Sequence, residues 1–188
     1  MFIVMSYNCI NYNCDDDLGS HTLNDCGAHV FGGYPNVIIL ECVHSITDPS
    51  NATQVQDAID AGEAHLVKNV SVELPVGSAT KVDSVIANEP QIVTRYEFSG
   101  TLRDPNVSSA NVTFYNNLTD GRTMGGIIFH NEREGKVYWH DAAVRFEGSI
   151  IMPINDQAPE IFETVFTFKK NLGSVNPAIY TEPAGIFS

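Results

Sequence analysis

Two runs of sequence decide the fold: AAVRFEGSIIM, residues 142–152, and IFETVFTFK, residues 161–169. In both runs apolar side chains recur at every second position, among them Phe146, Phe166 and Phe168, while polar ones such as Glu147 and Glu163 occupy the positions between. A period of two indicates an extended strand with one buried face and one wet face. A proline and a short polar run separate the two strands. The pattern therefore predicts a long antiparallel hairpin, with the three phenylalanines in one core.

The rest of the chain continues this pattern, with a single helical interruption. Asn51 is a suitable N-cap, apolar residues follow at spacings of three and four, and Gly62 is a suitable stop, which together predict a short helix over Asn51–Gly62. Alternating or continuous apolar runs predict further strands. These runs cover residues 37–43, 64–74, 81–87, 91–102, 111–115, 124–131 and 136–140.

These elements predict an all-β fold, a β-sandwich or barrel of about nine strands with one short helix. Residues 1–35 carry several glycines and an Asp-Asp-Asp run but little periodicity, so we expect an extended N-terminal arm that becomes ordered only in an assembly. Residues 36–175 form the predicted β domain. Residues 176–188 contain two prolines and form a C-terminal tail, either docked or free.

The charge is strongly acidic and unevenly distributed. The formal net charge of the 188 residues is −13, and no Lys or Arg precedes Lys68, whereas nine acidic residues do. An acidic surface repels nucleic acid and anionic membranes unless a basic patch interrupts it, and the sequence contains no such patch. No apolar run approaches the roughly 20 residues that span a bilayer. We therefore expect no membrane association, and synthesis in a cytosol.

Four cysteines lie in the first quarter of the chain. In a cytosol we expect thiols rather than disulfides. The spacing of Cys9, Cys14 and Cys26 does not match the close pairs of common zinc sites, so no metal is predicted, although metal binding by these three residues stays open as an alternative. Cys42 falls in an apolar run and is expected to be a small core residue.

The sequence carries no recognisable catalytic motif. It contains neither a phosphate-binding loop lysine nor a nucleophile elbow, and no cofactor is predicted. His130 and His140 flank one predicted hairpin and, with Asp141, form a conceivable metal or acid–base site, against the simpler interpretation of ordinary cross-strand pairing. We therefore predict that the protein is not an enzyme.

The order of elements resembles the tail tube proteins of tailed bacteriophages, particularly those of Bacteroidetes-type, crAss-like or related phages. The resemblance covers most of residues 30–170: a glycine-punctuated arm, a first apolar strand, one short helix, and alternating strands that end with Val144–Met152 and Phe162–Phe168. It implies a virion protein, made in the host bacterial cytoplasm, that forms hexameric rings. The rings stack into a tube, contact other virion proteins and let DNA pass without specific binding.

For such a subunit the candidate lumen or interface residues are Glu97, Glu147 and Glu163, because each lies mid-strand opposite apolar neighbours. Adjacent basic residues leave cross-strand ion pairs open as the alternative. Two other functions also stay open. One is a capsid decoration, head-fibre or head–tail connector protein, and the other is a ligand- or carbohydrate-binding β-sandwich module with Trp139 as a sugar platform.

Overall fold

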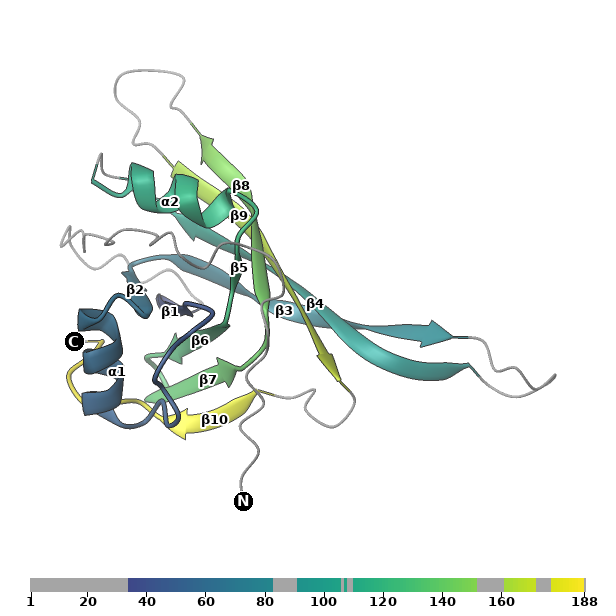
Figure 1. Ribbon diagram of the computed structural model, residues 1–188, viewed down its shortest axis with the longest axis horizontal. Helices are drawn as coiled ribbons and strands as arrows, with labels where there is room; N and C mark the ends of the chain where they lie inside the picture. The colour runs from purple at the N-terminus through teal and green to yellow at the C-terminus, as the bar shows by residue number, and fades with distance from the viewer. Residues whose placement is uncertain are drawn as a thin grey trace.

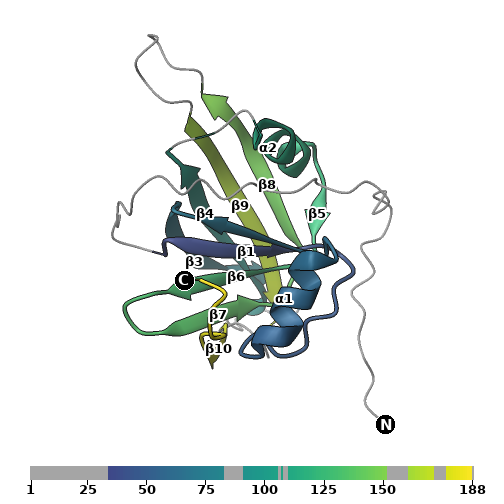
Figure 2. The ribbon, with the colours of Figure 1, turned by 90° about the vertical axis from the view of Figure 1, so that its left-hand side faces the viewer.

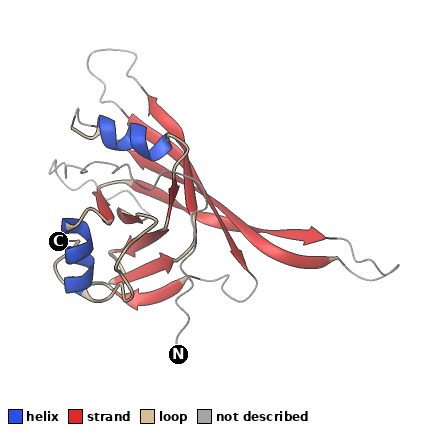
Figure 3. Cartoon of the chain, in the orientation of Figure 1, coloured by secondary structure: helices blue, strands red, loops and turns tan. Residues whose placement is uncertain are grey.

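The computed structural model describes residues 34–82, 91–105, 107, 110–151, 161–171 and 177–187. In this part of the chain there are ten strands and two helices (Figure 3). In chain order they are β1 (Asn36–Leu40), α1 (Ala52–Asp60), β2 (Ala64–Lys68), β3 (Ser71–Val82), β4 (Ile92–Asp104), α2 (Val112–Thr119), β5 (Thr123–Met124), β6 (Gly126–Asn131), β7 (Lys136–His140), β8 (Val144–Ile151), β9 (Ile161–Asn171) and β10 (Ala178–Thr181).

The strands form two antiparallel five-stranded sheets, which confirms the predicted all-β sandwich. The first sheet has the order β10-β7-β6-β1-β2 and the second has the order β3-β4-β9-β8-β5. One apolar core lies between the sheets and includes residues of both. A second apolar cluster lies on the opposite side of the first sheet, where α1 packs (Figure 1). Strand β1 is consequently buried along its whole length, as its continuous apolar sequence predicts.

The hairpin formed by β8 and β9 agrees with the sequence pattern. The two strands pair antiparallel, with Phe146 opposite Phe166 and Val144 opposite Phe168. Phe146, Phe166 and Phe168 are at most 2% exposed and belong to the core between the sheets, as predicted. Their polar neighbours Glu147 and Glu163 are exposed on the other face. The period of two thus correctly predicted that both segments are strands, and it predicted which face of each strand is buried.

Two strands predicted as continuous are interrupted, because the chain passes from one sheet to the other within them. The predicted strand 64–74 is divided into β2 and β3 at Asn69, whose φ of 60° lies in the left-handed region. The predicted strand 124–131 is divided into β5 and β6 at Gly125. A Cβ at Gly125 would lie 2.2 Å from the carbonyl oxygen of Glu41, so only glycine permits this close approach.

The predicted end of the strand 64–74, just before Pro75, is wrong. Pro75 lies inside β3, which is an edge strand, and its register with β4 shifts between Glu73 and Val76. An edge strand with an irregular register tolerates a residue without an N–H. Strand β3 therefore continues to Val82, and with β4 it forms a ribbon that projects from the sandwich (Figure 1). Of the separately predicted strand 81–87, Lys81 and Val82 are in a strand as predicted, but they form the end of β3 rather than a strand of their own; residues 83–87 lie outside the described part.

The strand predicted for residues 111–115 is also wrong, because these residues begin helix α2. Phe114, Tyr115 and Leu118 are buried on one side of this helix. The Tyr115 ring stacks on Phe162 of β9 at a centroid distance of 4.0 Å. A short run of aromatic and β-branched residues is compatible with either element, and packing against the core selects the helix.

The structure bears on both chain ends and on one cysteine. Of the predicted N-terminal arm, residues 1–33 lie outside the described part of the chain. The first strand ends at Leu40, short of the predicted Val43, which is 76% exposed. The expected free thiol is wrong at Cys42, which is disulfide-bonded and partly buried. At the other end, residues 177–187 dock on the first sheet.

Candidate functional site

The three glutamates singled out in the sequence lie on one surface, the outer face of the second sheet. Glu97 is in β4, Glu147 in β8 and Glu163 in β9, which are three adjacent strands. Each follows or precedes a core phenylalanine, so the alternation of the strand turns it away from the interior. The sequence therefore predicted correctly that these side chains point away from the core.

Two of the three glutamates form cross-strand ion pairs. Glu97 Oε2 lies 3.9 Å from Lys169 Nζ, and Glu163 Oε2 lies 3.9 Å from Arg103 Nε. Both pairs join β4 to β9 at directly opposite register positions. Their side chains are about half exposed, so each pair contributes about 0–1 kcal/mol to the free energy of unfolding. This arrangement agrees with the alternative of cross-strand ion pairs that the sequence left open.

The outer face of the second sheet is balanced in charge rather than acidic. Among the described residues from the base of the ribbon to β8, the face carries four carboxylates, Glu73, Glu97, Glu147 and Glu163, and four cations, Arg95, Arg103, Arg145 and Lys169; Lys81, near the end of β3, is a further exposed cation. A group of acidic residues with no Lys or Arg among them lies elsewhere in the described chain. Residues 41–63, which flank and form α1, contain five acids and no base, namely Glu41, Asp48, Asp57, Asp60 and Glu63.

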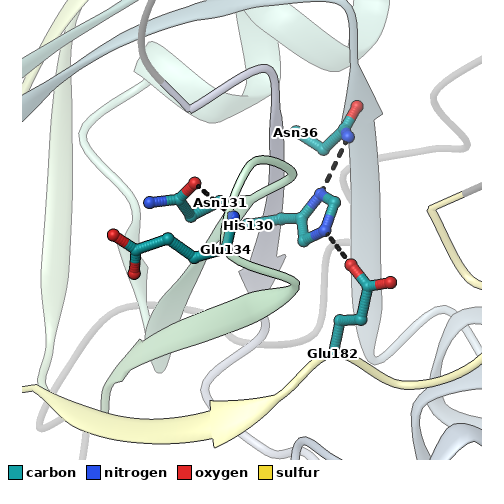
Figure 4. A network of polar contacts seen from close by, with 5 residues as sticks. All are labelled: Asn36, His130, Asn131, Glu134 and Glu182. Carbon is teal, nitrogen blue, oxygen red and sulfur yellow. Dashed lines mark hydrogen bonds and ion pairs between the residues drawn. The ribbon is translucent and has the colours of Figure 1, made fainter.

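A buried polar network joins the C-terminal segment to the first sheet (Figure 4). His130 is 2% exposed; its Nδ1 lies 3.0 Å from Asn36 Nδ2 and its Nε2 lies 2.5 Å from Glu182 Oε2. Because the Asn36 amide nitrogen donates to Nδ1, the proton of a neutral His130 is on Nε2 and is donated to Glu182. The Phe187 ring stacks on His130 with a centroid distance of 3.9 Å. No local sequence pattern predicts this network, since its members are far apart in the chain.

The proposed pairing of His130 with His140 is wrong. The turn at residues 132–135 places Asn131 opposite Lys136, so His130 faces Val137 and His140 faces Ile127. Moreover, the two rings lie on opposite faces of the first sheet. His130 contacts the C-terminal segment, whereas His140 lies in the core between the sheets, 4.6 Å from the Phe168 ring.

His140 is a buried histidine rather than a catalytic pair member. It is 3% exposed, and its Nδ1 has no hydrogen-bond partner within the described residues. Burial, reinforced by the nearby Lys170 ammonium, lowers the pKa of His140 to about 4. Burial also lowers the pKa of Lys170, against the opposing effect of Asp141. Burial thus disfavours the cationic form of both His140 and Lys170.

A second buried polar contact anchors α2. Tyr115 Oη donates to Asp104 Oδ2 at 2.5 Å, and Asp104 is 5% exposed. Burial, followed by the effect of the Asp104 carboxylate, raises the pKa of Tyr115. The sequence analysis missed this contact because Asp104 lies at the end of β4 and Tyr115 lies in α2, a helix that was not predicted. The hydroxyl and the carboxylate are fully enclosed, which is typical of a structural contact.

Trp139 does not provide an exposed platform for a sugar ring. It is 9% exposed and belongs to the apolar cluster between the first sheet and α1. Its Nε1 is buried without a hydrogen-bond partner in the described part of the chain. Stacking on a sugar requires an accessible ring face, which this packing removes.

The remaining findings concern metal binding, membrane-spanning helices and similarity to known proteins. Among the described residues, no group of three or more His, Cys, Asp or Glu side chains is arranged to hold a metal ion; Cys9, Cys14 and Cys26 lie outside that part. No helix in the described ranges is long and apolar enough to cross a membrane.

No protein-family model matches the chain, and no curated protein matches it.

Proposed function

We propose that this chain is a structural subunit that assembles with copies of itself, and more specifically a tail tube subunit of a tailed bacteriophage. The observation that carries the proposal is the β3–β4 ribbon. Pairing of β4 with β9 begins only at Arg95, so Lys81 and Val82 pair with Val93 and Ile92 beyond the reach of the other strands. The ribbon extends away from the sandwich (Figure 1).

A projecting ribbon of this kind needs a partner. An isolated two-stranded ribbon is at best marginally stable in water. At the base of the ribbon, where β4 still pairs with β9, Gly77, Ser78 and Ala79 of the edge strand β3 are exposed. A neighbouring subunit that packs on the ribbon would supply the missing apolar contacts. The ribbon lies at one end of the molecule and α1 at the other (Figure 1). If the ribbon of one copy packs on a different surface of the next copy, the contact is heterologous, and heterologous contacts generate rings or filaments.

The outer face of the second sheet is our candidate for the lining of a channel. In its described part between the base of the ribbon and β8, the four carboxylates and four cations offer a phosphate backbone no net positive charge, which supports passage of DNA without tight binding. If the face lines a lumen, replacing Glu97, Glu147 and Glu163 together with lysine leaves assembly intact and slows genome delivery. Normal delivery by such particles would exclude these residues from the lumen, and failed assembly would place them in a subunit contact.

The ribbon itself is tested by a pair of matched alanine variants. Ala79 lies on β3 at the base of the ribbon, opposite Tyr96, and Ala143 lies on the body just before β8; both are exposed. We expect Ala79→Arg to abolish rings or tubes seen by negative-stain electron microscopy, while Ala143→Arg leaves them unchanged. Both variants should keep the monomer melting temperature, because exposed substitutions have small effects on stability.

The outcomes of this experiment separate the candidate functions. Rings or stacked tubes from the wild-type protein that depend on Ala79 support the tail tube assignment. Assembly that tolerates Ala79→Arg contradicts the role of the ribbon. A wild-type protein that stays monomeric at high concentration contradicts the proposed function.

A further inference from the structure

One edge of the first sheet is closed by the C-terminal segment, residues 177–187. Strand β7 pairs with β6 on one side and with β10 on the other, and β10 is the last strand of that sheet. In both views of the molecule β10 runs along the outer side of β7 (Figure 1, Figure 2). The edge that β7 would otherwise present is therefore covered by the end of the same chain.

Strand β10 is itself a poor edge for the addition of further strands. It contains only the four residues Ala178–Thr181. Pro177 directly precedes it and Pro183 follows two residues after it, and neither proline has a backbone N–H. Short strands and prolines are features that keep sheet edges from pairing with other chains. The segment thus replaces the edge of β7 by one that pairs less readily.

The segment is held by its last residues more firmly than by its strand. In β10, Ala178 and Thr181 are exposed, and Ile179 is 58% exposed. Beyond the strand, Pro183 is buried and Ile186 is only 7% exposed. Burial of apolar side chains is the main favourable term in such docking, so the residues that follow β10 contribute most of it.

A tight turn directs this docked end onto the sheet. The backbone N–H of Ile186 donates to the Pro183 carbonyl at 3.4 Å, and Gly185 has a φ of 80°, which glycine adopts without strain. Ile186 joins the apolar cluster between the first sheet and α1, to which Val137 and Trp139 of β7 also belong. The end of the segment therefore covers the same strand whose edge β10 occupies.

Two contacts with His130 add to this anchorage. The Glu182 carboxylate accepts from Nε2 of His130, and the Phe187 ring stacks on the imidazole (Figure 4). Glu182 precedes the turn and Phe187 follows it, so both contacts are lost together when the end leaves the sheet. The docked end consequently acts as one unit.

We propose that the C-terminal segment is an autoinhibitory cover, which keeps the edge of β7 from pairing with another extended strand. The docked end, rather than β10, determines how often this edge opens. Once open, the edge presents the backbone of residues 136–139 together with the apolar side chains of Val137 and Trp139. An extended apolar peptide is the partner that such an edge accepts. This inference concerns the single chain, so its test is independent of the proposed assembly.

A matched pair of isoleucine variants of the full-length chain tests the role of the docked end. Ile186→Ser weakens that end, whereas Ile179→Ser makes the same change in β10. Hydrogen exchange followed by mass spectrometry reports on residues 136–139. We expect exchange there to be at least about tenfold faster in Ile186→Ser, because truncation of a buried aliphatic side chain shifts the opening equilibrium by at least that factor. In Ile179→Ser we expect a change of about twofold or less.

A fluorescent peptide with the sequence of residues 177–187 tests whether the open edge accepts a strand. In the wild-type chain the tethered segment competes at an effective concentration of roughly 1 mM, so the peptide binds weakly. Fluorescence anisotropy should show at least about tenfold tighter binding to Ile186→Ser than to the wild-type chain or to Ile179→Ser, because the competing segment is weakened by that factor.

Faster exchange in Ile186→Ser without tighter binding of the peptide would overturn the proposal, because the edge would open without accepting a strand. Equal exchange rates in the two isoleucine variants would overturn the role of the docked end. If Ile186→Ser also removes protection from β8 and β9, the same measurements are made on Glu182→Ala, which changes a side chain that is 42% exposed. Exchange of residues 136–139 at the wild-type rate in Glu182→Ala would then overturn the proposal.

Discussion

Replacing Phe166 with alanine should be among the most damaging single changes in the core. Phe166 is fully buried, with its ring 5.6 Å from the Phe129 ring and 5.9 Å from the Phe146 ring. Loss of burial alone costs about 1.5–3 kcal/mol, and the cavity left behind brings typical Phe→Ala losses to about 3–5 kcal/mol. We expect the upper half of this range, because Gly100 lies against the ring and has no side chain that can move into the space.

The same geometry predicts coupling between Phe166 and Gly100. A Cβ at Gly100 would lie 2.6 Å from Phe166 Cζ and 2.7 Å from the Glu73 carbonyl oxygen. Gly100→Ala alone should therefore destabilise the protein by about 1–3 kcal/mol, as overpacking does. In the Phe166→Ala background the ring clash is absent and only the carbonyl contact remains. The second substitution should then cost less than it does in the wild-type protein.

Urea unfolding followed by fluorescence of the single tryptophan, the buried Trp139, measures all four members of this cycle. Val165→Ala is the matched control, because Val165 is the adjacent residue, is 41% exposed and lies on the opposite face of β9. We expect it to change the free energy of unfolding by about 0.5 kcal/mol or less. The packing argument would be refuted if Phe166→Ala lowered the free energy of unfolding by no more than about 1 kcal/mol beyond the control. It would also be refuted if the effects of Phe166→Ala and Gly100→Ala were strictly additive.

Two further predictions concern buried polar groups. Because the pKa of His140 is about 4 in the folded state and ordinarily 6.5, the unfolded chain binds a proton first on acidification. The free energy of unfolding should therefore fall by about 3 kcal/mol between pH 6.5 and pH 4. In urea titrations, His140→Phe should remove this part of the pH dependence. If the free energy of unfolding of His140→Phe depended on pH as steeply as that of the wild-type protein, the prediction would be contradicted. Tyr115→Phe removes the hydroxyl that donates to buried Asp104 and should cost about 1–3 kcal/mol. An unchanged melting temperature for Tyr115→Phe would show that this hydrogen bond contributes nothing net.

The sequence alone determined the elements whose evidence is local. The two-residue period predicted the β8–β9 hairpin and the face that Phe146, Phe166 and Phe168 bury. The cap at Asn51 predicted α1, and the structure confirms that its side chain accepts from the N–H groups of Thr53 and Gln54. These predictions succeed because side-chain alternation and capping depend on neighbours within a few positions in the chain.

Only the tertiary structure decided the features that depend on distant partners. Residues 112–119 form a helix because Tyr115 packs on Phe162 and donates a hydrogen bond to Asp104. The breaks at Asn69 and Gly125 arise where the chain changes sheets, which no periodicity within one strand records.

The candidate sites show the same division. The outward direction of Glu97, Glu147 and Glu163 followed from alternation, but their pairing with cations on neighbouring strands required the register between β4 and β9. The His130 network joins residues 36, 130 and 182, whose separation in the chain hides them from any local pattern. Local sequence thus determined which face each side chain occupies, and long-range packing decided what it meets there, because strand order and register are set by contacts between segments far apart in the chain.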